Sequence, residues 1–251
     1  MEIIPALYIL DGRCVALYKA SYEQKASYEK SPLNVAKFFE KAGAKKLHLV
    51  DLDSRNERSE FRARPQAGIA TSVFQKIITA VKIPVQLEAS FKNLEEIHAA
   101  FNIGAAKIIL RPFALKIIPE AIKTFGAEKI IVEIQAKGSG VVGDGITSDG
   151  NPIDVVDFAE KLIPLGVKEI IYKDEHAEGT LIHPNYDEID RLFLIIGQNL
   201  KIYASAGISE PRRIKLLKKI GASGAIIGKA FYEHTITFEE AQQVAAAAVD
   251  Q

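Results

Sequence analysis

The chain is poor in several features that would assign it to common functional classes. It has a single cysteine, Cys14, which excludes an internal disulfide and fits a reducing cytosol. Basic and acidic residues number 32 each, so the formal net charge is zero and we expect no nucleic acid as the main partner. No apolar run reaches the roughly 18 residues of a transmembrane helix. The first residues, MEIIPALYIL, lack the pattern of a signal peptide. We expect a cytoplasmic protein with no membrane partner.

What is present is the composition of an ordinary globular protein. Hydrophobic residues make up 48% of the chain and charged residues 25%, which is enough apolar surface for a sizeable core. A length of 251 residues fits one large domain of the α/β-barrel class or two small domains.

Short apolar runs rich in Ile, Leu and Val alternate with segments of helical period. Such continuous runs are typical of parallel strands covered on both faces. Three helical segments have matching start and stop signals, for example Ser31, Pro32 and Gly43 around NVAKFFEKA. Eight strand–helix units in this length predict a (β/α)8 barrel. The eight predicted strands are 3–9, 46–51, 83–88, 107–111, 129–135, 168–173, 200–205 and 224–228.

The sequence also repeats itself. IPVQLEASFKNLEEI (83–97) aligns with LKIYASAGISEPRRI (200–214), and AGAKKLHLVD (42–51) aligns with LGVKEIIYKD (165–174). Further matches pair 102–113 with 219–230 and 2–9 with 129–136, so strands one to four correspond to strands five to eight. This predicts a single barrel over 1–251 built from half-barrels of about 1–126 and 127–251. A doubly wound open sheet is the alternative, but it would not require that pairing.

Small residues follow the seventh and eighth predicted strands. Ser205, Ala206 and Gly207 end the seventh, and Gly228 and Lys229 end the eighth. At such bends backbone N–H groups and a helix N-terminus can approach an anion, and this end of a barrel commonly holds phosphate. The alternative is that the glycines only permit tight turns. We predict a phosphate site and therefore a small phosphorylated metabolite as ligand.

Several phrases resemble the phosphoribosylformimino-5-aminoimidazole carboxamide ribotide (ProFAR) isomerase family of histidine biosynthesis. They are HLVDLD (48–53), EGTLIHPN (178–185), ASAGIS (204–209) and GAIIGKAFYE (224–233), and the resemblance spans nearly the whole chain. It implies a barrel that converts an aminoaldose to an aminoketose, on a substrate with a phosphate at each end. It also implies an aspartate acid and base ending strands one and five, and a glycine-rich phosphate bend in each half.

The chain departs from the family pattern at the positions that the resemblance makes functional. Tyr8 and Gln135 stand where the two aspartates are expected. An amide does not titrate near neutral pH, and the unperturbed pKa of tyrosine is about 10. We therefore predict that the parent activity is lost. The other departures are Glu88, Ala89, Ser90 and Arg111 at the first-half phosphate position, Lys173 before Asp174 at the end of strand six, and Glu178 for aspartate.

The altered residues allow three interpretations. Glu88, Arg111 and Lys173 can form an internal ion cluster that fills the former phosphate pocket. Alternatively Arg111, Lys92 or Lys173 can bind a carboxylate or another small anion. Lys173 can also act as a Schiff-base nucleophile if a neighbouring charge lowers its pKa.

Other polar segments carry weaker signals. The loop 54–68 contains Arg55, Arg58, Arg62 and Arg64, which fits either a lid over an anionic ligand or a solvated loop. Asp174, His176 and Glu178 alternate, but no second histidine has ligand spacing, so we predict no metal and no other cofactor. We assign no catalytic role to His48, His98 or His234.

Three functional hypotheses follow, all for a monomer. The first is a diverged barrel that binds one phosphorylated molecule at Ser205, Gly207, Gly228 and Lys229, with weak or altered chemistry at Tyr8, Asp174 or Glu178. The second is a non-catalytic pseudoenzyme with a binding or regulatory role. The third is an active ProFAR isomerase with a rearranged acid and base.

Overall fold

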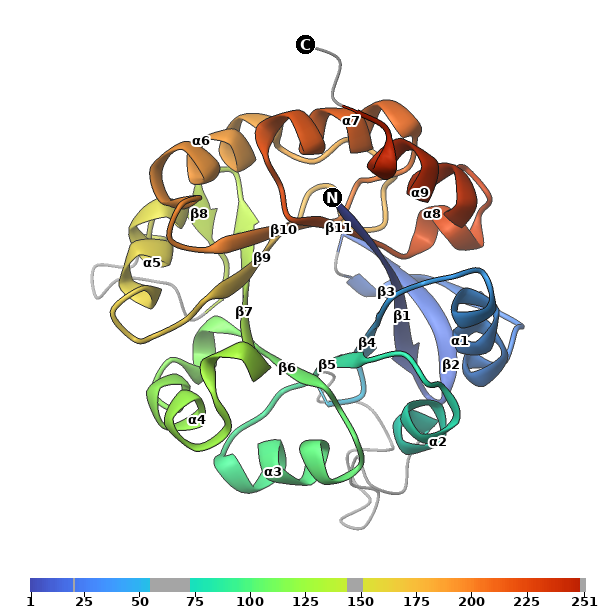
Figure 1. The fold of residues 1–251 in the computed structure, drawn as a ribbon, viewed down its shortest axis with the longest axis horizontal. Helices are drawn as coiled ribbons and strands as arrows, with labels where there is room; N and C mark the ends of the chain where they lie inside the picture. Colours follow the sequence, from blue (N-terminus) through green and yellow to red (C-terminus); the bar gives the residue numbers. More distant parts are fainter. Residues whose placement is uncertain (20, 55–72, 144–150, 249–251) are drawn as a thin grey trace.

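Eight parallel strands close into a barrel surrounded by helices (Figure 1), in a computed structural model that describes residues 1–19, 21–54, 73–143 and 151–248. The barrel closes where the first strand pairs with the last, with Glu2 opposite Gly224 and Pro5 opposite Ile227. The (β/α)8 barrel predicted from the sequence is confirmed. The barrel strands are β1 (Glu2–Leu10), β4 (Leu47–Asp51), β5 (Val85–Glu88), β6 (Lys107–Leu110), β7 (Ile130–Lys137), β9 (Glu169–Asp174), β10 (Lys201–Ser205) and β11 (Gly224–Ile227).

Each predicted strand coincides with one of these strands to within about two residues. The helices between them are α1 (Pro32–Lys41), α2 (Val73–Ala80), α3 (Leu94–Asn102), α4 (Ile118–Phe125), α5 (Val155–Leu162), α6 (Tyr186–Ile196), α7 (Pro211–Ile220), α8 (Lys229–Tyr232) and α9 (Phe238–Ala246), with short 3-10 turns at Pro112–Ala114 and Ala127–Lys129. No helix in the described ranges is both long and apolar enough to cross a membrane.

The core lies in two layers on either side of the barrel wall. Outward-facing strand residues pack against the helices, and a smaller inner layer fills the lumen with Ile4, Ile109, Ile131, Ile171 and Ile226. Burial of each such side chain contributes about 1.5–3 kcal/mol. Above this inner layer the inward positions become polar, and the candidate functional residues lie there.

A hairpin that the sequence reasoning did not predict extends from β1. It consists of β2 (Arg13–Tyr18), which pairs antiparallel with β1, and β3 (Ser21–Tyr28), which pairs antiparallel with β2. The short strand β8 (Gly140–Val141) pairs with β7 in the corresponding place of the second half. The polar alternation of SYEQKASY in β3 gives a mostly exposed strand, and this pattern lacks the apolar run by which the barrel strands were recognised.

Helices α1, α5 and α7 begin at the expected Pro and Asp residues, but one expected capping hydrogen bond is absent. α1 begins at Pro32 after Ser31, as predicted, but the Ser31 side chain makes no capping hydrogen bond. α7 begins at Pro211 and ends at Gly221, whose φ of 102° is in the left-handed region that glycine adopts without strain. α5 has a fully formed cap, because Asp154 accepts hydrogen bonds from the N–H groups of Val156 and Asp157.

The Asp154 cap gives a first testable prediction. Arg191 Nη2 donates to Asp154 Oδ1 at 2.6 Å, and this bond lowers the pKa of the carboxyl group below its usual value. We expect Asp154→Ala to lower the free energy of unfolding by about 1 kcal/mol at neutral pH, through loss of the cap. A carboxyl whose folded-state pKa is lowered stabilises the fold above its unfolded pKa, and that contribution is lost as the pH falls through the folded value.

The difference between wild type and Asp154→Ala should therefore narrow below about pH 4. Urea unfolding at a series of pH values measures it. Asp154→Asn is the matched control, because it keeps a capping oxygen but loses the charge that faces Arg191. A difference that does not change with pH would contradict this account.

Candidate functional site

The bend after β10 packs against the loop between β9 and α6. Ala206 and Gly207 have φ values of 75° and 69°. A Cβ on Gly207 would lie 2.2 Å from the carbonyl oxygen of Ile182, so this position requires glycine whether or not a ligand binds. Arg213 Nη1 donates to the carbonyl oxygens of Gly207 and Leu181, both at 2.6 Å, and so joins this bend to the β9–α6 loop.

The bend after β11 is formed by Gly228 at the start of α8. The first N–H groups of a helix, here those of Lys229 and Ala230, have no acceptor within the helix, and no side chain caps this one. The Lys229 side chain has a different role, because its Nζ donates to the carbonyl oxygen of Gly179 at 2.7 Å. Lys229 thus ties the two loops together.

A cavity with a volume of about 50 Å³ lies between these two bends. That is room for a few water molecules, which is comparable to one small anion. Gly179 and Glu178 line it from the β9–α6 loop, and Leu17 lines it from the β2–β3 hairpin. The hairpin is fixed there because the Lys19 N–H donates to the Glu178 carbonyl oxygen at 2.8 Å. The predicted phosphate residues Ser205, Ala206, Gly207, Gly228 and Lys229 all line this cavity.

Tyr8 stands on the inner side of the cavity. Its ring lies close to Gly228, since a Cβ on that glycine would be 3.3 Å from Tyr8 Cε2. The Lys173 ammonium lies 5.1 Å from the centroid of the same ring. An aromatic ring therefore separates the cavity from the barrel centre at the position where the resemblance predicts a carboxylate.

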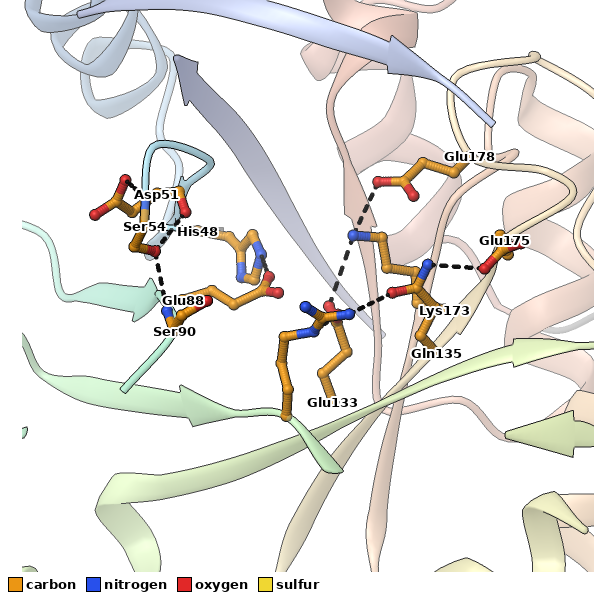
Figure 2. A network of polar contacts seen from close by, with 11 residues as sticks. His48, Asp51, Ser54, Glu88, Ser90, Glu133, Gln135, Lys173, Glu175 and Glu178 are labelled. Atoms are coloured by element: carbon orange, nitrogen blue, oxygen red, sulfur yellow. Dashed lines mark hydrogen bonds and ion pairs between the residues drawn. The ribbon is translucent and has the colours of Figure 1, made fainter. Parts of the chain in front are cut away.

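Charged and amide side chains are joined across the β6, β7 and β9 strand ends (Figure 2). Lys173 Nζ lies 2.9 Å from Glu178 Oε1 and 3.9 Å from Glu133 Oε2. Arg111 Nε lies 3.9 Å from the other oxygen of Glu133, and Arg111 Nη2 donates to Gln135 Oε1 at 2.9 Å. Lys173 and Glu133 are both at most 1% exposed, so this network is within the barrel.

Gln135 completes the network on its outer side. Its Nε2 donates to Glu175 Oε2 at 3.2 Å, while its oxygen accepts from Arg111. The amide therefore bridges a guanidinium and a carboxylate, which a single carboxylate could not do. Glu133 was missed by the sequence reasoning. Its signal was present, because a charged residue two positions before Gln135 in the run IIVEIQ faces the same side of the strand.

The corresponding bend of the first half, residues 88–90 at the end of β5, has buried side chains that contact other residues of the protein. Glu88 is fully buried, and its Oε2 lies 3.1 Å from His48 Nε2 (Figure 2). Gln86 Nε2 lies 2.9 Å from His48 Nδ1, so this histidine has a polar neighbour at each ring nitrogen. Ala89 is buried as well. The interior place of His48 was missed, although a polar residue within the run LHLV could have indicated it.

The backbone at this bend is also satisfied internally. The Ser90 N–H donates to Ser54 Oγ at 3.0 Å, and the Ser54 hydroxyl in turn donates to the Asp51 carbonyl oxygen at 2.9 Å. The donor that would approach a phosphate is therefore used within the protein. Lys92, the other predicted anion-binding residue of this half, is exposed.

Asp174 holds the loop between β9 and α6 by accepting backbone hydrogen bonds. Its Oδ1 accepts from the N–H of His176 at 2.9 Å, and its Oδ2 accepts from the N–H of Asn185 at 2.9 Å. The alternating Asp174, His176 and Glu178 therefore do not converge, since Glu178 faces Lys173 instead. Within the described ranges no group of three or more His, Cys, Asp or Glu residues could hold a metal ion. The four arginines of loop 54–68 lie outside the described residues.

Cys14 is set apart from this chemistry. It is buried beside Tyr232, and burial raises the pKa of its thiol above the ordinary value. A second buried group, Tyr203 in the inner core layer, is also outside the site. Burial raises the pKa of its phenol, which therefore stays protonated.

Comparison with known proteins identifies the family. A family model described as "Histidine biosynthesis protein" matches residues 2–237. The chain belongs to this histidine biosynthesis family. It is 35% identical to the 1-(5-phosphoribosyl)-5-((5-phosphoribosylamino)methylideneamino)imidazole-4-carboxamide isomerase of Bacillus mycoides strain KBAB4, over 97% of this chain and 98% of the relative. The same identity and coverage relate it to the isomerases of the same name from Bacillus anthracis strains CDC 684 and A0248.

The resemblance to ProFAR isomerases inferred from the sequence is thereby confirmed. Within this histidine biosynthesis family the chain is a ProFAR isomerase-like barrel with Tyr8 and Gln135 at the predicted acid and base positions. One half of its strand-end surface carries a cavity between two glycine bends, and the other half carries buried polar side chains.

Proposed function

We propose that this barrel binds one phosphorylated small molecule, as a monomer, with the phosphate in the cavity between the β10 and β11 bends. The observation that carries the proposal is the difference between the two halves. The second half has a cavity bordered by Gly207, Gly228 and the start of α8. The first half uses its bend N–H at Ser90 within the protein, and the buried Glu88 carboxylate lies beside His48.

We further propose that the two-phosphate isomerisation of the family has been lost. The family reaction needs groups that exchange protons near neutral pH on both sides of the sugar. Gln135 is held as an amide bridge between Arg111 and Glu175, and Tyr8 lies against Gly228 and Lys173. Neither side chain is suited to that exchange.

A retained isomerase is the second candidate function. It is favoured by 35% identity to named isomerases along almost the entire chain. Glu178 would then be the working carboxylate, since it lines the cavity and lies 2.9 Å from the Lys173 ammonium. A barrel without catalysis that binds or regulates is the remaining alternative, and it shares the phosphate site of the first proposal.

Titration with inorganic phosphate tests the binding proposal. We expect one saturable site by calorimetry, and we expect Gly228→Ala to weaken it about tenfold or more, because the added methyl group lies between the ligand and Tyr8. Gly228 has a φ of −114°, outside the left-handed region that favours glycine, and circular dichroism verifies that the alanine variant folds.

Lys92→Ala is the control, because it removes an exposed ammonium from the same end of the barrel and should leave the affinity unchanged. No saturable binding by the wild-type protein would overturn the proposal. So would a Gly228→Ala variant that binds phosphate as well as the wild type does.

A further inference from the structure

A buried amine lies directly behind the phosphate cavity. Lys173 is fully buried in the barrel, and its Nζ lies 2.9 Å from the Glu178 carboxylate and 3.9 Å from the Glu133 carboxylate. Tyr8 and Glu178, which are its neighbours, also line the cavity. A single layer of side chains therefore separates the amine from the place where the phosphate is proposed to bind.

We propose that Lys173 forms an imine with the carbonyl carbon of a small phosphorylated aldehyde or ketone held by its phosphate in this cavity. The inference rests on the proposed phosphate site and adds to it the class of substrate. The cavity is small, at about 50 Å³, so the phosphate group takes up most of it. The proposal places the carbonyl end of the molecule on the side lined by Tyr8 and Glu178, which is the side nearest to Lys173.

Glu178 carries the protons of this step. It accepts a proton from the Lys173 ammonium at 2.9 Å, which frees the amine to attack the carbonyl carbon. After the attack the nitrogen gives up one of its two protons to the former carbonyl oxygen, which becomes a hydroxyl. The Glu178 carboxylic acid then returns its proton as this hydroxyl leaves as water. The net change is an ammonium and a carbonyl giving a protonated imine and one water, with no oxidant or reductant.

Glu133 and Tyr8 are placed to stabilise the positive charge of the protonated imine. Glu133 lies 3.9 Å from both Lys173 and Arg111, so one carboxylate is shared by two cations. The carboxylate of Glu133 lies on the side of the imine nitrogen, where it stabilises the positive charge. Tyr8, 5.1 Å from Nζ, offers an aromatic face to the same cation.

Reductive trapping tests the proposal. The intact protein is incubated with glycolaldehyde phosphate and cyanoborohydride, and its peptides are mapped by mass spectrometry. We expect one reduced adduct on the peptide that contains Lys173, formed about tenfold or more faster than with unphosphorylated glycolaldehyde. Exposed Lys92 reports non-specific labelling in the same digest.

Two variants sharpen the test. Lys173→Arg keeps the positive charge between the two carboxylates but forms no adduct that cyanoborohydride traps, so labelling of this peptide should disappear. Glu178→Gln should slow trapping because the proton acceptor is lost. Circular dichroism verifies that both variants fold, and mapping of the wild-type protein identifies the labelled lysine without either variant.

The outcomes separate this inference from the phosphate proposal. Saturable phosphate binding with no adduct at Lys173, or with labelling only at exposed lysines, overturns the imine and leaves the phosphate site standing. A Lys173 adduct that forms equally fast with both aldehydes, together with no phosphate binding, supports the amine and overturns the phosphate site.

Discussion

A histidine auxotroph that lacks ProFAR isomerase should fail to grow without histidine when it expresses this chain. The physical reason is the proposed loss of both proton-transfer groups at Tyr8 and Gln135, since a general acid or base contributes about 10²- to 10⁴-fold each. Purified protein should accordingly turn over ProFAR at least about 10³-fold more slowly than a Bacillus relative. The relative expressed from the same vector is the positive control.

Growth at the normal rate would contradict the proposed loss of activity. If Glu178→Gln then abolished that growth, Glu178 would be identified as the working carboxylate of a retained isomerase. If it did not, the acid and base would have to lie among other residues.

The double variant Tyr8→Asp and Gln135→Asp extends this prediction. We expect no restored growth, because Glu88 and Ser90 still occupy the first-half bend and a second phosphate has no place to bind. The new carboxylate at position 135 would also face the Glu175 carboxylate, which now accepts a hydrogen bond from the Gln135 amide. Appreciable growth would show that proton transfer alone had been lost.

Lys173→Met should destabilise the protein by about 3–5 kcal/mol, the cost of leaving a buried partner charge uncompensated. Glu178 and Glu133 would then face each other across an apolar side chain. Chemical unfolding monitored by circular dichroism measures the change. Lys107→Met is the matched control, because Lys107 also pairs with a carboxylate, Glu169, but its side chain is 23% exposed. That substitution should cost about 1 kcal/mol or less.

The double variant Lys173→Met and Glu178→Gln tests the cause of the Lys173 effect. Removing the leftover carboxylate charge should recover about half of the loss or more, since replacing both members of a buried pair costs less than removing one. If Lys173→Met lowered the free energy of unfolding by no more than Lys107→Met does, the account of Lys173 as a buried ammonium paired with carboxylates would be contradicted.

The barrel was predictable because its signals are local and repeated. Several strands are nearly continuous in Ile, Leu and Val, and the eightfold alternation with helices leaves few other folds. The β2–β3 hairpin was missed because SYEQKASY is a polar strand that pairs along one edge only. The cap at Asp154 was readable from its place before an apolar run, whereas the missing hydrogen bond at Ser31 depends on a side-chain orientation that sequence does not determine.

The candidate site was predictable in part. The strand ends predicted that Glu88, Arg111 and Lys173 lie at one end of the barrel, because parallel strands bring such positions together. Arg111 and Lys173 do share a network through Glu133, whereas Glu88 contacts His48. Partner choice was not predictable. Glu133 links Arg111 to Lys173, and His48 contacts Glu88, through side-chain distances that depend on barrel tilt and register.

The pairing of β1 with β11 has a consequence for how this chain is made. Glu2 and Gly224 meet in one parallel ladder, so the first strand lacks this neighbour until more than two hundred further residues have been synthesised. Contacts between such distant residues are slow to form, and an unpaired strand edge can recruit other chains in the meantime. Closure of the barrel therefore comes last, and a chain that ends before β11 leaves this edge of β1 open to pairing with other chains.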